Sequence, residues 1–386
     1  MTAICEIATH CGEAFVPFLN ETITVLTKAA SNWHPLVKSE AADALASMVI
    51  PIVAAKHGGS VDWKKGDILG ASPLSAEATA VASEVLKQLV DLMQNDGDKE
   101  TVSSACSGVE SVINLCGPHA LKVVGNQCLE ATIALLTKTA GCQLAANVED
   151  FDDEDDHDSL MTSVCDLVAA FGRVMGSHFC EYLPQFLPAI CDYAKTSRPA
   201  SDRAMAIGCL GELAQELGDG IKEYWKLVFL PAVLAGLADE DHNVNRNAAF
   251  CAGVCCEGLG ASIATDYSQI LQLVGQLFSI DLSIADTSAA AVDNAAACVC
   301  RMIMAVPTSV PIQQVLPVLL KSLPLKNDMT ENNTVYTCLL NLLQMNNSDA
   351  LAHKDEMKKI FEVAIGHDSN VEDDMKQKLG IAMQQM

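Results

Sequence analysis

The chain has 386 residues, more than the roughly 250–300 at which one hydrophobic core stops growing, so it forms either several domains or a repeat array. Aromatic residues make up 5% of the chain, and its formal net charge is −25. Because a field of this sign repels nucleic acid and anionic lipid and attracts basic proteins, we expect no direct binding to nucleic acid or to a membrane.

The N-terminal part, residues 1–148, carries 15 acidic and 9 basic residues. It begins directly in a helical pattern, without a capping residue that would shield an exposed end. This start predicts a fragment of a longer protein. Its least regular stretch is the Gly-rich loop 58–74, which contains Trp63.

Residues 149–158 form a strongly acidic run that holds eight carboxylates and no basic residue. The run lies between apolar helical patterns at 126–146 and 160–172, so we expect an acidic loop that joins the two helices of one repeat. Dense like charge cannot form a core, so the loop is expected to be extended and mobile. Asp158 or Ser159 is expected to cap the helix that follows.

A docking strip for a basic partner is the preferred function of this loop. Several short-range attractions raise the association rate and make binding salt-sensitive, and Phe151 offers one apolar anchor. A solvated insertion without a specific role is the alternative, and a calcium site is disfavoured because the run lacks the spaced glycine of a calcium loop. The candidate binding residues in the loop are Glu149, Asp150, Phe151, Asp152, Asp153, Glu154, Asp155, Asp156 and Asp158.

Residues 159–386 carry 26 acidic and 15 basic residues and contain a regular repeat. Leu187-Pro188 recurs 43 residues later as Leu230-Pro231 and 86 residues after that as Leu316-Pro317. Leu273-Val274 occupies the intervening position inside another apolar helix. Four helices therefore share one phase, which is the signature of a repeat architecture.

The second helix of each unit repeats as well. Residues 206–218 align with residues 248–260, and small residues on one face let neighbouring helices approach closely. Gly218 and Gly260 stand where a helix ends on a left-handed residue. The pattern resembles HEAT repeats and predicts an all-α solenoid over 1–148 and 159–386. We expect a right-handed superhelix of about nine helix pairs, with the first helices outside and the second helices lining the concave face.

The second helices also carry acidic residues. The candidate binding residues among them are Glu212, Glu216, Glu257 and Asp293, with Glu40, Asp43 and Asp166 on earlier second helices. A row of acids along a groove suits Lys/Arg-rich peptides, because many modest ion pairs add up. The alternative for any one of them is that it solvates the helix surface or caps a neighbouring helix.

The sequence contains no catalytic motif: no Gly-rich phosphate loop, no His-Glu-x-x-His, no Gly-x-Ser-x-Gly and no Cys-x-x-Cys. Its 16 cysteines fall within helical patterns, so we expect reduced, buried thiols. Cys251, Cys255 and Cys256 come nearest to a metal site, and helix packing is the preferred interpretation. We expect no enzyme, no cofactor and no metal. The longest apolar run, 227–238, is also short of the roughly 20 residues that span a bilayer.

Four segments point to a known family: Pro199–Gly208, Arg246–Val254, Val292–Cys298 and Leu323–Asp328. They are similar to segments in the C-terminal half of importin-β-type karyopherins, most of all in the importin-4 branch. The resemblance covers residues 100–386 clearly and residues 1–100 through their helical pairing.

The resemblance implies a monomeric nuclear import receptor that shuttles between cytoplasm and nucleus with basic cargo, such as core histones or ribosomal proteins. It further implies nucleoporin binding on the outer face and cargo release by the Ran GTPase at N-terminal repeats. Because those repeats are missing here, we expect weak binding to Ran or none. The alternative is a HEAT-repeat scaffold subunit of a stable multiprotein complex.

Overall fold

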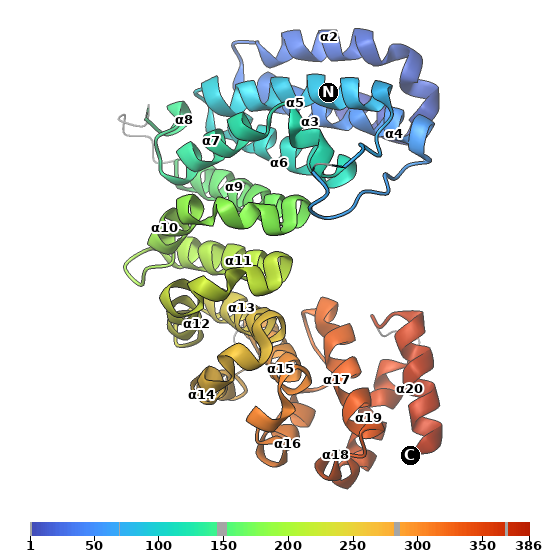
Figure 1. Ribbon diagram of the computed structural model, residues 1–386, viewed down its shortest axis with the longest axis vertical. Helices are drawn as coiled ribbons and strands as arrows, with labels where there is room; N and C mark the ends of the chain where they lie inside the picture. The colour runs from blue at the N-terminus through green and yellow to red at the C-terminus, as the bar shows by residue number, and fades with distance from the viewer. Residues whose placement is uncertain (1, 69, 145–152, 282–285, 367–369) are drawn as a thin grey trace. The chain divides into compact units, whose positions relative to one another are not determined.

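The computed structural model describes residues 2–68, 70–144, 153–281, 286–366 and 370–386, and only the backbone of residues 153–158 and 286 (Figure 1). The chain divides into two compact units, residues 1–192 and 193–386. Both consist of α-helices joined by short 3₁₀ and π segments, and the described ranges contain no strand. The predicted all-α class is confirmed.

The first unit runs from α1 to α10. Its helices are α1 Thr2–Cys11, η1 Gly12–Phe18, α2 Leu19–Ala30, α3 Pro35–Ser47, α4 Val49–His57, α5 Ala76–Asn95, α6 Lys99–Cys116, η2 Pro118–Lys122, α7 Gly125–Leu136, α8 Gly141–Leu144, α9 Asp153–Met175, η3 Gly176–Glu181 and α10 Leu183–Tyr193. Within this unit α2 packs on α3, α5 on α6 and α7 on α9. The second helices of these pairs, α3, α6 and α9, also pack on one another in that order.

The second unit repeats the same scheme. Its helices are α11 Ala200–Leu217, η4 Gly218–Tyr224, η5 Trp225–Phe229, α12 Leu230–Leu237, α13 His242–Leu259, η6 Gly260–Asp266, α14 Tyr267–Leu277, α15 Asp286–Ala305, η7 Pro307–Ser309, α16 Ile312–Ser322, η8 Met329–Glu331, α17 Asn332–Gln344, α18 Ser348–Ala352, α19 Lys354–Ala364 and α20 Asp373–Gln385. α12 packs on α13, α14 on α15 and α19 on α20, while α11, α13, α15 and α17 form a continuous row. Helix pairs stacked on their neighbours confirm the predicted solenoid.

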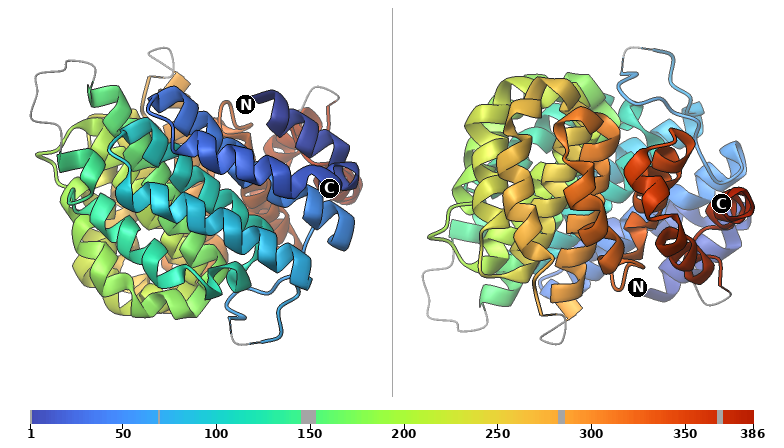
Figure 2. Two further views of the ribbon diagram at one scale, coloured as in Figure 1. Left: turned by 90° about the horizontal axis from the view of Figure 1, so that it is seen from above. Right: turned by 90° about the horizontal axis from the view of Figure 1, so that it is seen from below.

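Small residues bring the second helices close together, as the sequence predicts. Ala248 and Ala252 on α13 and Ala296 on α15 are fully buried, and these two helices lie side by side in the right view of Figure 2. A Cβ atom at Gly253 would lie 3.1 Å from the Cα of Cys298, so the two backbones meet almost directly.

Gly218 and Gly260 end α11 and α13 with positive φ angles of 55° and 49°, as predicted. Their ψ angles of −120° and −128° take them outside the left-handed helical region. Only glycine adopts this conformation without strain, and it directs the chain into the 3₁₀ turn that follows each helix.

The acidic run differs from its prediction. Helix α9 begins at Asp153, so the backbone of residues 153–158 is helical, and Asp158 and Ser159 lie inside the helix instead of capping it. Acidic residues are favourable in the first turn of a helix because they face the positive end of its dipole, and this effect opposes their mutual repulsion. Residues 149–152 lie outside the described part of the chain.

Three stretches of the described residues are long and apolar enough, by length and composition, to cross a membrane: Ser159–Glu181, His242–Leu277 and Thr287–Ala305. The expectation from the sequence rested only on uninterrupted apolar runs, none of which is long enough to span a bilayer. That expectation was wrong, because segments that contain a few charged residues can also be apolar enough on average. In one apolar 18-residue window of each stretch, 72%, 56% and 89% of the window is buried within the fold, so helix packing accounts for the hydropathy.

Gly253→Ala is expected to lower the free energy of unfolding by about 1–3 kcal/mol, because the added methyl group must displace the backbone of α15. Gly275→Ala on α14 is the matched control. No atom lies within 4 Å of that Cβ position, so the same change is expected to stabilise the helix by about 0.5–1 kcal/mol. Urea unfolding followed by circular dichroism measures both effects, and a Gly253→Ala protein as stable as the wild type would contradict the close approach.

Candidate functional site

Acidic side chains gather on the row of second helices in the first unit. Glu40 and Asp43 come from α3, Glu100 and Glu110 from α6 and Asp166 from α9. We call these five residues the first-unit acidic face. They form two groups: the packing of α6 against α3 brings Glu40 and Asp43 near Glu100, and its packing against α9 brings Glu110 near Asp166.

Asp43 lies at the α3–α6 side of this face. Its side chain reaches solvent, but the helices that crowd it raise the pKa of its carboxyl by desolvation. A hydrogen bond with the Ser104 side chain partly opposes this shift, while the nearby carboxylates of Glu40 and Glu100 add to it. The charged form of Asp43 is therefore held in an unfavourable environment.

Glu110 and Asp166 form the α6–α9 side of the face. Desolvation raises the pKa of Glu110, and the charge of Asp166 raises it further. Desolvation also raises the pKa of Asp166. Arg173 on α9 lowers both pKa values, and Asn114 lowers that of Glu110 through a 3.2 Å hydrogen bond from its Nδ2 to Glu110 Oε1. Since both net shifts are upward, these groups do not fully compensate for burial and like charge.

A groove with a volume of about 520 Å³ lies beside Asp43, between α3 and α6. Ala46, Ile50, Val112 and Leu115 contribute apolar surface to the groove, while Asp43 and the hydroxyls of Ser47, Ser107 and Ser111 supply polar groups. Such a combination can hold the aliphatic stem of a long side chain and place a cationic end near a carboxylate.

The predicted residues of the second unit have separate surroundings. Glu257 on α13 is 62% exposed and forms an ion pair with Arg301 of α15, with 3.3 Å between Oε2 and Nε. The same Arg301 is buried and pairs with Glu331 Oε2 at 2.9 Å. Glu212 and Glu216 are half-buried on α11, and both take part in further interactions. A binding role for Glu212, Glu216 and Glu257 stays a prediction, and Glu257 already has a cationic partner in Arg301.

Asp293 is a wrong prediction as a binding residue. Its side chain is 1% exposed, and it accepts hydrogen bonds from the backbone N–H groups of Lys326, Asn327 and Asp328 at 2.6–3.1 Å. A carboxylate that accepts three backbone N–H groups fixes a loop and presents no charge to solvent. It holds the segment between α16 and η8 against α15.

The acidic-run candidates are only partly visible. Glu149, Asp150, Phe151 and Asp152 lie outside the described residues. The backbone of residues 153–158 forms the start of α9, and the structure does not describe the side chains of these residues. The docking strip therefore stays a prediction.

The described residues include no group of three or more His, Cys, Asp or Glu side chains that could hold a metal ion. All 16 cysteines are free thiols. Burial raises the pKa of the Cys298 thiol to about 12 and raises those of Cys255 and Cys256 as well. A thiol that stays protonated is a poor nucleophile and a poor metal ligand, so packing accounts for the Cys251, Cys255 and Cys256 group.

Sequence reasoning missed Glu100, Glu110 and Arg173. Glu110 shares one stripe of α6 with Ser107, three residues before it, and Asn114, four residues after it, and this polar stripe on an otherwise apolar helix is a signal that could have found it. Arg173 gave no such signal, because its importance depends on the packing of α9 against α6.

Replacing Asp43, Glu110 and Asp166 together with Asn, Gln and Asn is expected to raise the free energy of unfolding at pH 7. A carboxyl whose pKa is raised by folding binds its proton more tightly in the folded state, so stability falls as pH rises through the folded pKa. The amide side chains remove this loss. The gain is expected to vanish below the ordinary pKa values of 3.8 for Asp and 4.5 for Glu.

Urea unfolding of the wild type and the triple variant between about pH 3.5 and 8 measures how the stability difference depends on pH. This range covers the titration of ordinary carboxyl groups and the raised pKa values. Glu21→Gln on the exposed side of α2 is the control and is expected to change stability by less than about 0.5 kcal/mol. A triple variant less stable than the wild type at pH 7 would show that the carboxylates stabilise the fold.

No family model matches the chain. Among curated proteins it is 27% identical over 391 residues to the probable importin subunit beta-4 of Schizosaccharomyces pombe, covering 98% of this chain and 36% of that protein. It is 25% identical over 353 residues to importin-4 of Mus musculus, covering 90% of this chain and 31% of that protein. The chain thus spans about a third of the length of these relatives.

Solved structures show the same fold at lower identity. Kap121p bound to RanGTP superposes with a TM-score of 0.74 at 16% identity, over 99% of this chain and 34% of that one. Importin beta superposes with a TM-score of 0.73 at 14% identity, over 96% of this chain and 44% of that one. The curated relatives and the solved structures both match nearly the whole chain. They confirm the resemblance to importin-β-type karyopherins of the importin-4 branch that four sequence segments predicted.

Proposed function

We propose that this chain is part of a nuclear import receptor and that it binds basic segments of its cargo on the first-unit acidic face. The observation that carries the proposal is the upward shift of three carboxyl pKa values on adjacent helices. A bound cation stabilises carboxylates whose charged form is disfavoured by desolvation and by neighbouring acids, so the face gains free energy on meeting Lys or Arg side chains.

The α3–α6 groove favours a lysine-rich segment with apolar residues between the lysines. Its apolar residues Ile50 and Leu115 suit an aliphatic stem, and Asp43 supplies the charge for an ammonium group. Core histones and ribosomal proteins are the cargo classes with such segments that we propose. The acidic run from Glu149 to Asp158 belongs to the same proposal, as a docking strip that precedes and begins α9 and so adds attraction next to the face.

The relatives support a transport role more than an enzymatic one. Curated relatives are importins by name, and solved neighbours include Kap121p bound to Pho4p, to Nup53p and to RanGTP. By analogy we propose cargo and nucleoporin binding for this chain, shuttling between cytoplasm and nucleus, and Ran binding through repeats that the relatives have beyond this region. The chain alone is then expected to bind Ran weakly or not at all.

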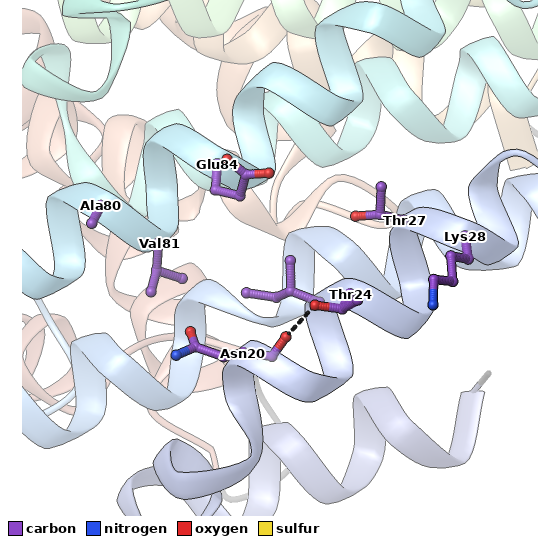
Figure 3. A pocket seen from close by; sticks show the side chains of 8 residues that line it. Asn20, Thr24, Thr27, Lys28, Ala80, Val81 and Glu84 are labelled. Carbon is purple, nitrogen blue, oxygen red and sulfur yellow. Dashed lines mark hydrogen bonds between the residues drawn. The ribbon is translucent and has the colours of Figure 1, made fainter.

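A second groove suits a nucleoporin. It lies between the first helices α2 and α5, has a volume of about 540 Å³ and is lined by Ile23, Ala80 and Val81 with the polar residues Asn20, Thr24 and Glu84 around them (Figure 3). An apolar slot with a polar surround can take one aromatic side chain of a flexible segment. We propose that phenylalanines of phenylalanine–glycine repeats bind here.

The variant Asp43→Asn, Glu110→Gln and Asp166→Asn is expected to bind a fluorescein-labelled peptide of alternating lysine and alanine about tenfold more weakly at 0.1 M salt, because each lost ion pair contributes about 0.2–1 kcal/mol. Its affinity should also depend less steeply on salt, since fewer charges are paired. Fluorescence anisotropy at salt concentrations from about 0.05 to 0.5 M measures the affinity and its salt dependence. Over this range the Debye length falls enough to screen exposed ion pairs.

The matched control removes the same charge elsewhere: Glu13→Gln, Glu21→Gln and Glu130→Gln on η1, α2 and α7, all exposed. Equal weakening in both triple variants would mean that only net charge matters, and the face would lose its role.

Release of a bound histone complex by full-length receptor with GTP-loaded Ran would mark a carrier. Retention of that complex would instead favour the scaffold alternative.

Val81→Asp is expected to abolish binding of a phenylalanine–glycine repeat peptide, because it places a charge in the α2–α5 groove where an aromatic ring would lie. Val25→Asp on α2 is the control, since Val25 is 55% exposed and does not line the groove. Isothermal titration with the repeat peptide compares the two, and equal affinities would remove the groove from the proposal.

A further inference from the structure

The connection between α4 and α5 crosses the ends of two later helices. We call its residues 61–67 the Trp63 segment; it belongs to the blue connection that leaves α4 in Figure 1. Trp63 donates a hydrogen bond from Nε1 to the carbonyl oxygen of Asn114, at 3.2 Å. Gly66 donates its backbone N–H to the carbonyl oxygen of Val174, at 2.9 Å.

Both acceptors are carbonyls that their own helices leave without a partner. Asn114 is in the last turn of α6, and Val174 is in the last turn of α9. The last four carbonyls of an α-helix have no intrahelical donor and need another group. The Trp63 segment therefore supplies donors to the C-terminal ends of two neighbouring helices at once.

The segment fits closely against both ends. Any side chain at Gly117, the residue after α6, would collide with the ring of Trp63. A Cβ atom at Gly66 would lie 3.2 Å from the carbonyl oxygen of Met175, and one at Gly176 would lie 3.1 Å from Lys65 Cγ. Glycine at both helix ends is what lets the segment lie directly on the backbone.

The segment is long enough to bridge the ends of two packed helices. Trp63 and Gly66 are three residues apart, so they span at most about 10–11 Å. Packed helices have axes about 8–10 Å apart. The Trp63 segment thus links the ends of α6 and α9 through two hydrogen bonds, and a large separation of these ends would break one of them.

Asn114 connects this contact to the first-unit acidic face. Its carbonyl oxygen accepts the bond from Trp63, while its side chain donates to Glu110 Oε1 and accepts from Arg173 Nη1, each at 3.2 Å. One residue thus joins the Trp63 segment, the carboxylate on α6 and the guanidinium on α9.

We propose that Trp63 and Asn114 are positioning residues for the binding of basic ligands: through α6 and α9 they fix the spacing of Glu110 and Asp166. This inference rests on the proposed function of the acidic face. Trp63 acts without contacting the ligand, because its hydrogen bond goes to the backbone of Asn114, and the Asn114 side chain in turn holds Glu110. Loosening it lets α6 and α9 shift, so the two carboxylates no longer meet the same cation.

The test is a mutant cycle with the lysine–alanine peptide as ligand. Trp63→Ala is expected to weaken binding about fivefold, and Trp63→Phe, which keeps a ring but loses the N–H donor, by about twofold, on the scale of one lost hydrogen bond. In a protein that already carries Glu110→Gln and Asp166→Asn, Trp63→Ala is expected to have no further effect. Trp33→Ala, at a side chain 85% exposed, is the control for losing a tryptophan.

The outcomes separate the two proposals. If Glu110→Gln with Asp166→Asn leaves affinity unchanged, the α6–α9 side of the acidic face is not part of the binding site, whereas the Asp43 side is tested by the triple variant. If that change weakens binding but Trp63→Ala does not, or if Trp63→Ala weakens binding equally in both backgrounds, the positioning role is wrong. Circular dichroism and thermal unfolding of Trp63→Phe verify that the fold is kept, so the milder variant decides the question if Trp63→Ala does not fold.

Discussion

Close packing of second helices through small residues is the constraint on which the other features depend. In the second unit, a Cβ atom at Gly253 of α13 would lie only 3.1 Å from the Cα of Cys298 on α15. In the first unit, a Cβ atom at Gly108 of α6 would lie 3.3 Å from Ala46 of α3 and 3.1 Å from Leu89 of α5. Where helices approach so closely, there is little room for a larger side chain at the contact, so residues at its edges meet residues of the next helix.

This crowding has opposite electrostatic consequences in the two units. In the second unit the neighbours carry opposite charge: Arg301 lies between Glu257 and Glu331, and Arg203 forms a bidentate pair with Asp239 at 2.7–2.8 Å. That pairing lowers the pKa of Asp239 against the desolvation that opposes it. In the first unit desolvation raises the carboxyl pKa values, like charge adds to it at Asp43 and Glu110, and Arg173 opposes the shift only in part. One packing rule thus yields a partly neutralised surface in the second unit and a face that favours a cation in the first.

The repeat could be predicted because its signals are local. A helix period, small residues and a glycine after the helix are all visible within one segment, and the 43-residue spacing then fixes the phase. The environment of a single acid could not be predicted, because it depends on distant residues. Asp293 and Glu257 both lie on second helices and both carry a carboxylate. Asp293 is buried by a loop 33–35 residues further along the chain, while Glu257 remains 62% exposed.

The Trp63 segment was the least regular part of the sequence for the same reason. It has no helical period, and its donors serve carbonyls that are 51 and 108 residues away along the chain. In a solenoid each repeat contacts only its neighbours, so spacing errors can accumulate along the array. A segment that leaves α4 and reaches the ends of both α6 and α9 restrains three successive repeats together. Such a restraint is most useful where two carboxylates must meet one cation, because a preorganised site loses less conformational entropy when its ligand binds.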